Sequence, residues 1–168
     1  MTKARDNSSL SGLVLLETKT FSGLTELNFS NIISSTYSHY RVEFNSLFSV
    51  GAGALNFRGR INLTDVAGTA YDAPVIAFNR AGVVSNFGVN GTSAARIGTT
   101  NTTRTTFLNI NFSAVGNYLY FYTNGISPID DGLIGGGMVT GASPITGFTI
   151  FPASGTMTGT ASVYGYRK

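Results

Sequence analysis

The side chains that could carry out acid–base or nucleophilic chemistry are few in this sequence. Its single histidine, His39, lies between Ser38 and Tyr40. A Ser-His-Asp triad can draw its members from distant positions. However, the sequence contains no Gly-x-Ser-x-Gly segment, which would hold a nucleophilic serine in a sharp turn. We therefore expect His39 to be a packed or hydrogen-bonded structural residue, and we predict no catalytic residue.

The eight carboxylates offer weak alternatives. A glycoside hydrolase needs two carboxyl groups that face each other across a cleft, and Asp65 and Asp72, which flank one apparent loop, are the pair that a depolymerase would use. Adjacent Asp130 and Asp131 point apart in an extended chain, but they could bind a hard cation together with backbone carbonyls. Their spacing fits no EF-hand, so a solvated loop is the preferred interpretation, and we predict neither a metal nor a cofactor.

Tyrosines form the one regular arrangement of side chains with binding potential. Tyr118, Tyr120 and Tyr122 alternate with Leu119 and Phe121, so in a strand the three tyrosines share one face. If that face is exposed, they form an aromatic ladder that could bind glycan or a neighbouring subunit, since tyrosine combines an apolar ring with a polar tip. The alternative is a tyrosine-rich inner face.

Short strands must position these residues. Twenty-one glycines and many Asn, Ser and Thr residues separate short apolar runs, a rhythm typical of a sandwich or barrel. Alternation is clearest where Tyr40, Val42 and Phe44 oppose Arg41 and Glu43, and where Leu55 to Leu63 opposes Asn56, Arg58, Arg60 and Asn62. The predicted strands are Leu13–Phe21, Leu27–Ile33, Tyr40–Phe48, Leu55–Leu63, Val75–Phe78, Val83–Val89, Thr105–Phe112, Tyr118–Thr123, Ile145–Phe151 and Ala161–Tyr166.

Turn signals complete the predicted fold. Asn124-Gly125 is a strong hairpin signal and Asn90-Gly91 a weaker one, because both residues of a type I′ turn need a positive φ. The glycine-rich segment 130–137 should be a mobile loop or a site of close backbone approach. About ten short strands in one domain predict an all-β fold, an antiparallel β-sandwich: jelly-roll-like first, a more general sandwich second.

The composition limits the classes of partner. Only 11% of residues are charged and the net charge is +3, with no cluster of lysine or arginine, so we expect no nucleic-acid partner. There is no apolar run long enough to span a membrane, and we expect no membrane partner. With no cysteine, a disulfide scaffold is excluded. The chain shows no secretory signal, so we expect synthesis in a cytoplasm and release by lysis or within a particle.

The chain divides into a short N-terminal arm and one domain. Residues 1–11 differ in composition from the rest and carry the dense charges Lys3, Arg5 and Asp6. We interpret them as an arm that docks on a neighbouring protein, the alternative being a disordered tail. Residues 12–168 form the single β-sandwich domain.

Three segments carry a resemblance to a known group of proteins. The opening Thr2-Lys-Ala-Arg-Asp-Asn7 resembles a Lys-Ala-Arg-Asp motif near the start of tail-fibre and virion modules of marine and cyanobacterial phages. The ending, Ile145 to Gly155 followed by Ala161 to Tyr166, resembles the last two strands of such modules. The segment Phe29 to Leu47, with its Tyr37-Ser-His-Tyr-Arg41, is similar to them more loosely.

The resemblance implies a jelly-roll-like module on the surface of a tailed-phage virion, commonly a homotrimer. The leading expectation is a non-enzymatic tail-fibre or receptor-binding module whose partners are itself, other virion proteins and host surface glycan. A capsid decoration (cement) protein is the first alternative, and a carbohydrate-binding module with a cellular role is the second. The chain contains no shaft, heptad or collagen-like repeat, which favours a compact module over the tip of a long fibre.

Overall fold

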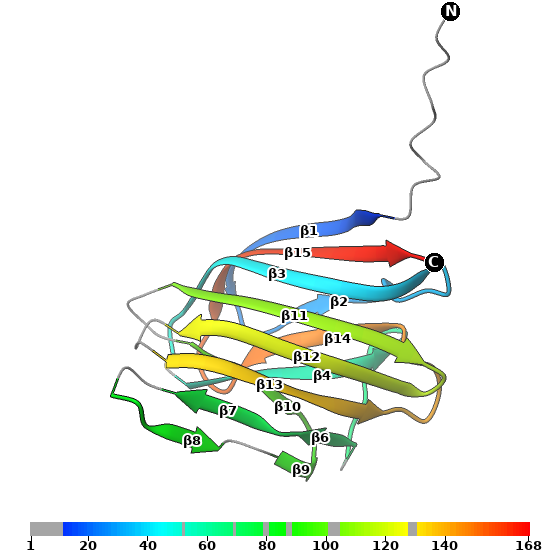
Figure 1. Ribbon diagram of the computed structural model, residues 1–168. Helices are drawn as coiled ribbons and strands as arrows, with labels where there is room; N and C mark the ends of the chain where they lie inside the picture. The colour runs from blue at the N-terminus through cyan, green and yellow to red at the C-terminus, as the bar shows by residue number, and fades with distance from the viewer. Residues whose placement is uncertain are drawn as a thin grey trace, which may run out of the picture.

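The fold was obtained as a computed structural model, in which all regular elements of the described residues are β-strands. The described residues are 12–51, 53–68, 70–78, 81–86, 89–100, 105–127 and 131–168. The predicted docking arm, residues 1–11 with Lys3, Arg5 and Asp6, lies outside them. Within them the strands form two antiparallel sheets, one of ten strands and one of five (Figure 1).

The ten-stranded sheet forms the front layer in Figure 1. Its main path runs β1-β15-β3-β11-β12-β13-β6-β9, and β7 adds to β13 while β8 adds to β7. Its strands are β1 (Leu13–Leu24), β3 (Tyr37–Ser49), β6 (Tyr71–Ala73), β7 (Val75–Phe78), β8 (Val84–Asn86), β9 (Val89–Thr92), β11 (Thr106–Val115), β12 (Tyr118–Ser127), β13 (Asp131–Thr140) and β15 (Met157–Arg167).

The five-stranded sheet lies behind it, in the order β10-β4-β14-β2, with β5 paired to β4 (Figure 1). Its strands are β2 (Leu27–Phe29), β4 (Gly53–Ile61), β5 (Thr64–Asp65), β10 (Ala95–Thr100) and β14 (Gly147–Pro152). Packed antiparallel sheets of this kind make the chain a β-sandwich, as predicted. The more specific jelly-roll connectivity stays a prediction.

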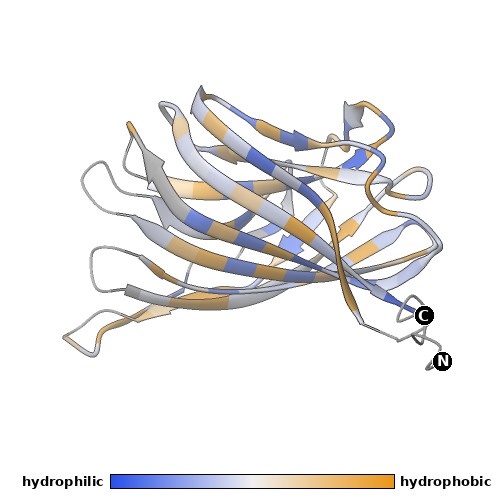
Figure 2. Cartoon of the chain, turned by 90° about the horizontal axis from the view of Figure 1, so that it is seen from above, coloured by the Kyte–Doolittle hydropathy of each residue, from blue (hydrophilic) through white to orange (hydrophobic). Residues whose placement is uncertain are grey.

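Aromatic side chains from both sheets meet in the core between them. The rings of Phe57 in β4 and Phe121 in β12 lie 5.3 Å apart, and those of Phe148 in β14 and Phe112 in β11 lie 5.2 Å apart. These spacings are typical of favourable aromatic pairs. Hydrophobic and hydrophilic residues alternate along the strands in Figure 2, because successive side chains of a strand point to opposite faces.

Alternation is therefore a reliable guide to the buried face. Tyr40, Val42 and Phe44 are all buried, as predicted. The same holds for Leu55 and Phe57, but the predicted strand ends early: β4 stops at Ile61, and Leu63 is exposed in the following turn.

Both predicted hairpin turns are wrong. Asn124 and Gly125 lie within β12, where they pair with Asn109 and Leu108 of β11. The hairpin between these strands turns instead at Gly116 and Asn117, where Gly116 has a φ of 58°. Gly125 serves close packing, because a Cβ there would lie 2.6 Å from the carbonyl oxygen of Phe107.

The second turn signal, Asn90-Gly91, lies within β9, whose pairing with β6 contains an irregularity. The predicted strand Val83–Val89 is not one strand, since β8 pairs with β7 whereas β9 pairs with β6. Further elements differ from prediction: β2 ends at Phe29, well before Ile33, and β5, β6 and β10 were not predicted.

The glycine-rich segment is a strand and not a loop. Residues 131–140 form β13, which pairs along its whole length with β12. A Cβ at Gly136 would lie 2.8 Å from the carbonyl oxygen of Phe121, and one at Gly137 would lie 2.8 Å from Cα of Ala73. The glycines therefore allow close backbone approach, which was the second of the two predicted roles.

Candidate functional site

The tyrosine ladder lies on the outer face of the ten-stranded sheet. Tyr118, Tyr120 and Tyr122 are 43%, 47% and 43% exposed, whereas Leu119 and Phe121 between them are buried in the core. The rings of Tyr118 and Tyr120 stack with centroids 6.1 Å apart. Of the two orientations that the sequence left open, the structure has the tyrosines facing outward.

The strand register sets further side chains beside the ladder. On the outer face one cross-strand row runs through Tyr164, Arg41, Asn111 and Tyr122. In the neighbouring row Tyr166 pairs with His39, and Ser113 pairs with Tyr120.

Tyrosines of β15 and β12 therefore stand on either side of a strip built by β3 and β11. Because β15 and β12 are three strand spacings apart in the sheet, their tyrosines are separated by about 14 Å along the hydrogen-bonding direction. Between them lie mainly polar side chains.

This arrangement creates a groove of about 680 Å³, which we call the tyrosine groove. Besides the buried Tyr40, Phe112 and Phe121, its lining consists of Ser38, His39, Asn111, Ser113, Tyr120, Tyr122, Tyr166 and Arg167. The volume lies within the range of small-molecule sites, and an apolar lining with a few polar groups is typical of them. Tyr118 is on the same face but lies outside the groove.

Hydrogen-bonding groups form the floor of the tyrosine groove. His39 is exposed, and its Nδ1 lies 3.0 Å from Oγ of Ser38. Asn111 and Ser113 are half-buried, and their amide and hydroxyl groups can each donate and accept hydrogen bonds. The floor can therefore bind a ligand that carries many hydroxyl groups.

One ion pair borders the groove. Arg41, two residues from His39 on the same face of β3, has its Nη2 2.8 Å from Oε1 of Glu43. Both side chains are about one-third exposed, so water screens the pair and its contribution to stability is small.

A second feature of the same face is an apolar row at the other end of the strands. The register aligns Phe107, Ile126, Gly132, Phe78 and Val84 across five strands. Except for the glycine, these side chains are exposed large hydrophobics, as are Ile134 and Ile76 in the adjacent row. We call the six exposed side chains the apolar band. A groove of about 420 Å³ lies over part of it.

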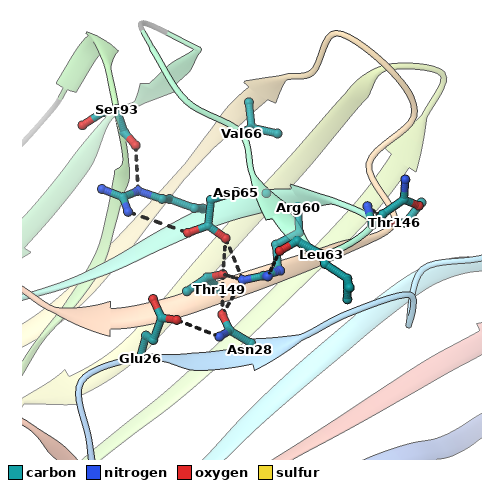
Figure 3. Close-up of polar contacts among 12 residues, drawn as sticks. Glu26, Asn28, Arg60, Leu63, Asp65, Val66, Ser93, Thr146 and Thr149 are labelled. Atoms are coloured by element: carbon teal, nitrogen blue, oxygen red, sulfur yellow. Dashed lines mark hydrogen bonds and ion pairs between the residues drawn. The ribbon is translucent and has the colours of Figure 1, made fainter.

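The outer face of the five-stranded sheet carries a buried polar cluster instead (Figure 3). Arg60 was predicted to be solvated, but it is only 8% exposed. Its Nη1 donates to Oδ1 of Asp65 at 2.8 Å, to Oδ1 of Asn28 at 2.6 Å and to Oγ1 of Thr149 at 2.8 Å, and its Nη2 donates to the carbonyl of Leu63. The β4–β5 turn folds back over the guanidinium, which alternation alone does not reveal.

Further contacts fix Asn28 and Asp65, which bind Arg60 in the cluster. The side-chain amide of Asn28 donates to Oε1 of Glu26 at 2.9 Å, and so its oxygen faces Arg60 (Figure 3). Arg58 lies 3.7 Å from Oδ2 of Asp65. With both carboxylate oxygens of Asp65 engaged by arginines, we interpret this cluster as structural.

Asp65 and Asp72, the pair considered for a depolymerase, do not face each other. Asp65 lies on the outer face of the five-stranded sheet in the cluster just described. Asp72 is exposed on β6 of the other sheet, between buried Tyr71 and Ala73, and accepts a hydrogen bond from the amide of Gly91 at 3.0 Å.

Buried Tyr71 links the two sheets. Its hydroxyl donates to the carbonyl of Val66 at 2.7 Å and accepts from the amide of Gly59 at 3.2 Å. Burial raises the pKa of Tyr71 well above its ordinary value of 10.0, because the charged form would lose its hydration.

Neither a metal cluster nor a membrane helix occurs in the ranges that the structure describes. No three His, Cys, Asp or Glu residues there come together as metal ligands. No helix there has the length and apolarity needed to cross a membrane. Of the aspartate pair considered for a cation, Asp130 lies outside those ranges.

Sequence reasoning found one wall of the tyrosine groove and missed the rest. Tyr120 and Tyr122 were predicted as possible contact residues, whereas Tyr166, Asn111 and Ser113 were not. His39 was expected to be only structural. Each of them adjoins a buried residue in its strand, which indicates an outward face but not which strands become neighbours. No protein-family model matches this chain, and no curated protein matches it.

Proposed function

We propose that this chain is a non-enzymatic saccharide-binding protein that acts as a small tail-fibre or receptor-binding module on the surface of a tailed-phage virion. The observation that carries the proposal is the tyrosine groove, with Tyr120 and Tyr122 on one side, Tyr166 on the other, and amide and hydroxyl groups between them. The resemblance of both chain ends to phage virion modules supports the virion location, with synthesis in the host cytoplasm and release by lysis.

Saccharides suit such a groove for two physical reasons. A sugar ring has apolar C–H faces that stack on aromatic rings, and tyrosine adds a hydroxyl at the rim. Its hydroxyl groups need donors and acceptors when they leave water, and Asn111, Ser113 and His39 supply both. The groove is open along the sheet surface, as a polymer chain requires.

The apolar band favours a second role in assembly. Groups of exposed apolar side chains on a protein surface often mark contacts with other proteins. From β11 to β8 the aligned partners in its two rows are asparagines and a glycine, and Glu43 of β3 stands beyond Asn109 at the end of the second row. Copies of the chain can therefore meet over the strands from β11 to β8 without covering a charged side chain of these two rows. This supports the proposed homotrimer. The second candidate function that we propose is that of a capsid decoration protein.

Binding measurements on the isolated protein test the role of the tyrosine groove. The isolated protein should bind host cells or an array of surface glycans, and Tyr120→Ala should abolish most of that binding while the circular-dichroism spectrum stays unchanged. Binding that survives in Tyr120→Ala would contradict the role of the groove.

Immunogold labelling of virions separates the two candidate functions. We expect label on tails. Label on heads alone, together with a rise in the melting temperature of expanded capsids, would favour the decoration role. Light scattering should give a trimer mass, and Phe107→Ser in the apolar band should lower it, whereas a monomeric wild-type mass would refute the trimer.

A further inference from the structure

Two arginines lie at the tyrosine groove, Arg167 in its lining and Arg41 beside it. Among the described residues that line the groove, Arg167 is a cation, His39 presents an imidazole, and none is Asp or Glu. Arg41 follows His39 on the same face of β3, and its row contains Asn111 and Tyr122 of the groove.

One carboxylate of this face lies on the side of Arg41 that is away from His39. Glu43 lies one row farther from His39, level with Asn109, and Arg41 binds it at 2.8 Å. A negative group in the groove would thus approach Arg41 from the His39 side, with the guanidinium between it and Glu43. Only one of the guanidinium's five N–H donors is needed for the contact with Glu43 at that distance.

We infer that the tyrosine groove binds an acidic saccharide, whose carboxylate lies toward Arg41, His39 and Arg167 while its ring stacks on Tyr120 or Tyr122. This inference rests on the proposed saccharide-binding function. A neutral sugar would use the aromatic wall and the amide floor but would gain nothing from the positive charge of Arg41 and Arg167. An acidic sugar uses both this charge and the aromatic wall, since arginine binds carboxylates through short charge-assisted hydrogen bonds.

The ion pair offers two substitutions with matched structural effect and opposite electrostatic effect. Arg41→Gln and Glu43→Gln break the same exposed contact with side chains of similar length. Arg41→Gln removes the attracting cation, whereas Glu43→Gln removes the repelling anion and releases the guanidinium. A purely structural role would shift the affinities of both variants in the same direction. Arg58→Gln, on the outer face of the other sheet, controls for the loss of one positive charge away from the groove.

The probes are two pairs of saccharides that differ in the carboxylate: oligogalacturonate with its carboxyl-reduced counterpart, and sialyllactose with lactose. Calorimetry or surface plasmon resonance gives the Kd of each. We expect the acidic member of at least one pair to bind about tenfold more tightly, which is the scale of one charge-assisted hydrogen bond. Arg41→Gln should remove this preference, Glu43→Gln should increase it, and Arg58→Gln should leave it unchanged. Added salt should weaken only the acidic member.

The outcomes separate this inference from the function on which it rests. Equal binding of acidic and neutral members, reduced by Tyr122→Ala, would overturn the acidic preference and leave saccharide binding intact. The same shift in Arg41→Gln and Glu43→Gln would also overturn it. If no member of either pair binds and no glycan on an array binds, both the acidic preference and the saccharide-binding function are overturned.

Discussion

Tyr122→Ala and Tyr118→Ala form a matched pair that tests the tyrosine groove directly. The two tyrosines lie on the same face of β12 and are equally exposed, at 43%, but only Tyr122 lines the groove. An aromatic side chain presents about 200 Å², so about 85 Å² of Tyr122 remains for a ligand to cover. At about 25 cal/mol per Å², full coverage contributes about 2 kcal/mol.

A ligand covers part of this area, and the ring loses some freedom when it binds, so we expect a loss of about 1–2 kcal/mol in Tyr122→Ala. That corresponds to a Kd about five to thirty times higher. Tyr118→Ala should change the Kd less than about twofold. Both variants should lose less than about 1 kcal/mol of folding stability, because the side chains are half-exposed.

The assay is titration of a glycan that binds the wild-type chain, with urea unfolding measured in parallel. Equal losses of affinity in the two variants would refute the assignment of the groove, since they would show that any tyrosine of this face contributes alike. The assignment would also be refuted if the loss of affinity in each variant followed its loss of folding stability, measured by the urea midpoint, and not whether its tyrosine lines the groove.

Three further predictions concern stability. Asp65→Asn should cost about 2–3 kcal/mol in urea unfolding, because it leaves a buried guanidinium without its counter-ion, whereas the exposed Asp72→Asn should cost less than about 0.5 kcal/mol. Gly137→Ala should destabilise by about 1–3 kcal/mol through backbone overlap, while Gly98→Ala, where a Cβ makes ordinary contacts no closer than 3.5 Å, should be neutral or mildly stabilising. Burial raises the pKa of Tyr71 in the folded chain, so the contribution of its neutral hydroxyl to the free energy of unfolding is complete below the ordinary pKa of 10.0 and is lost as the pH rises above it. Tyr71→Phe should therefore be less stable than the wild type at neutral pH but lose stability less steeply in alkaline solution.

Local pattern was enough to predict the class of fold. Alternation placed Tyr40, Val42 and Phe44 on a buried face, and their neighbours on the outer one, because strand geometry fixes a period of two whatever lies nearby. The same rule put the three tyrosines of β12 on one common face. It could not decide which face of that strand was inside, since both carry large side chains.

Turns and glycines were misread for a related reason. Asn124-Gly125 has the residues of a tight hairpin, yet the chain turns at Gly116, and Gly125 is needed where β12 passes close to Phe107. A glycine that permits a positive φ and a glycine that permits close packing look identical in sequence. The distinction depends on atoms from another strand.

The amino-acid sequence by itself determined that the chain folds as β-strands around an aromatic core with a weakly charged exterior, because side-chain alternation and composition act locally. Only the tertiary structure decided that β15, β3, β11 and β12 are neighbours, and so that Tyr166, His39, Asn111 and Tyr122 share one groove. His39 and Tyr166, which are 127 positions apart, meet there through strand pairing. The pairing is selected by how the two sheets bury their apolar faces together.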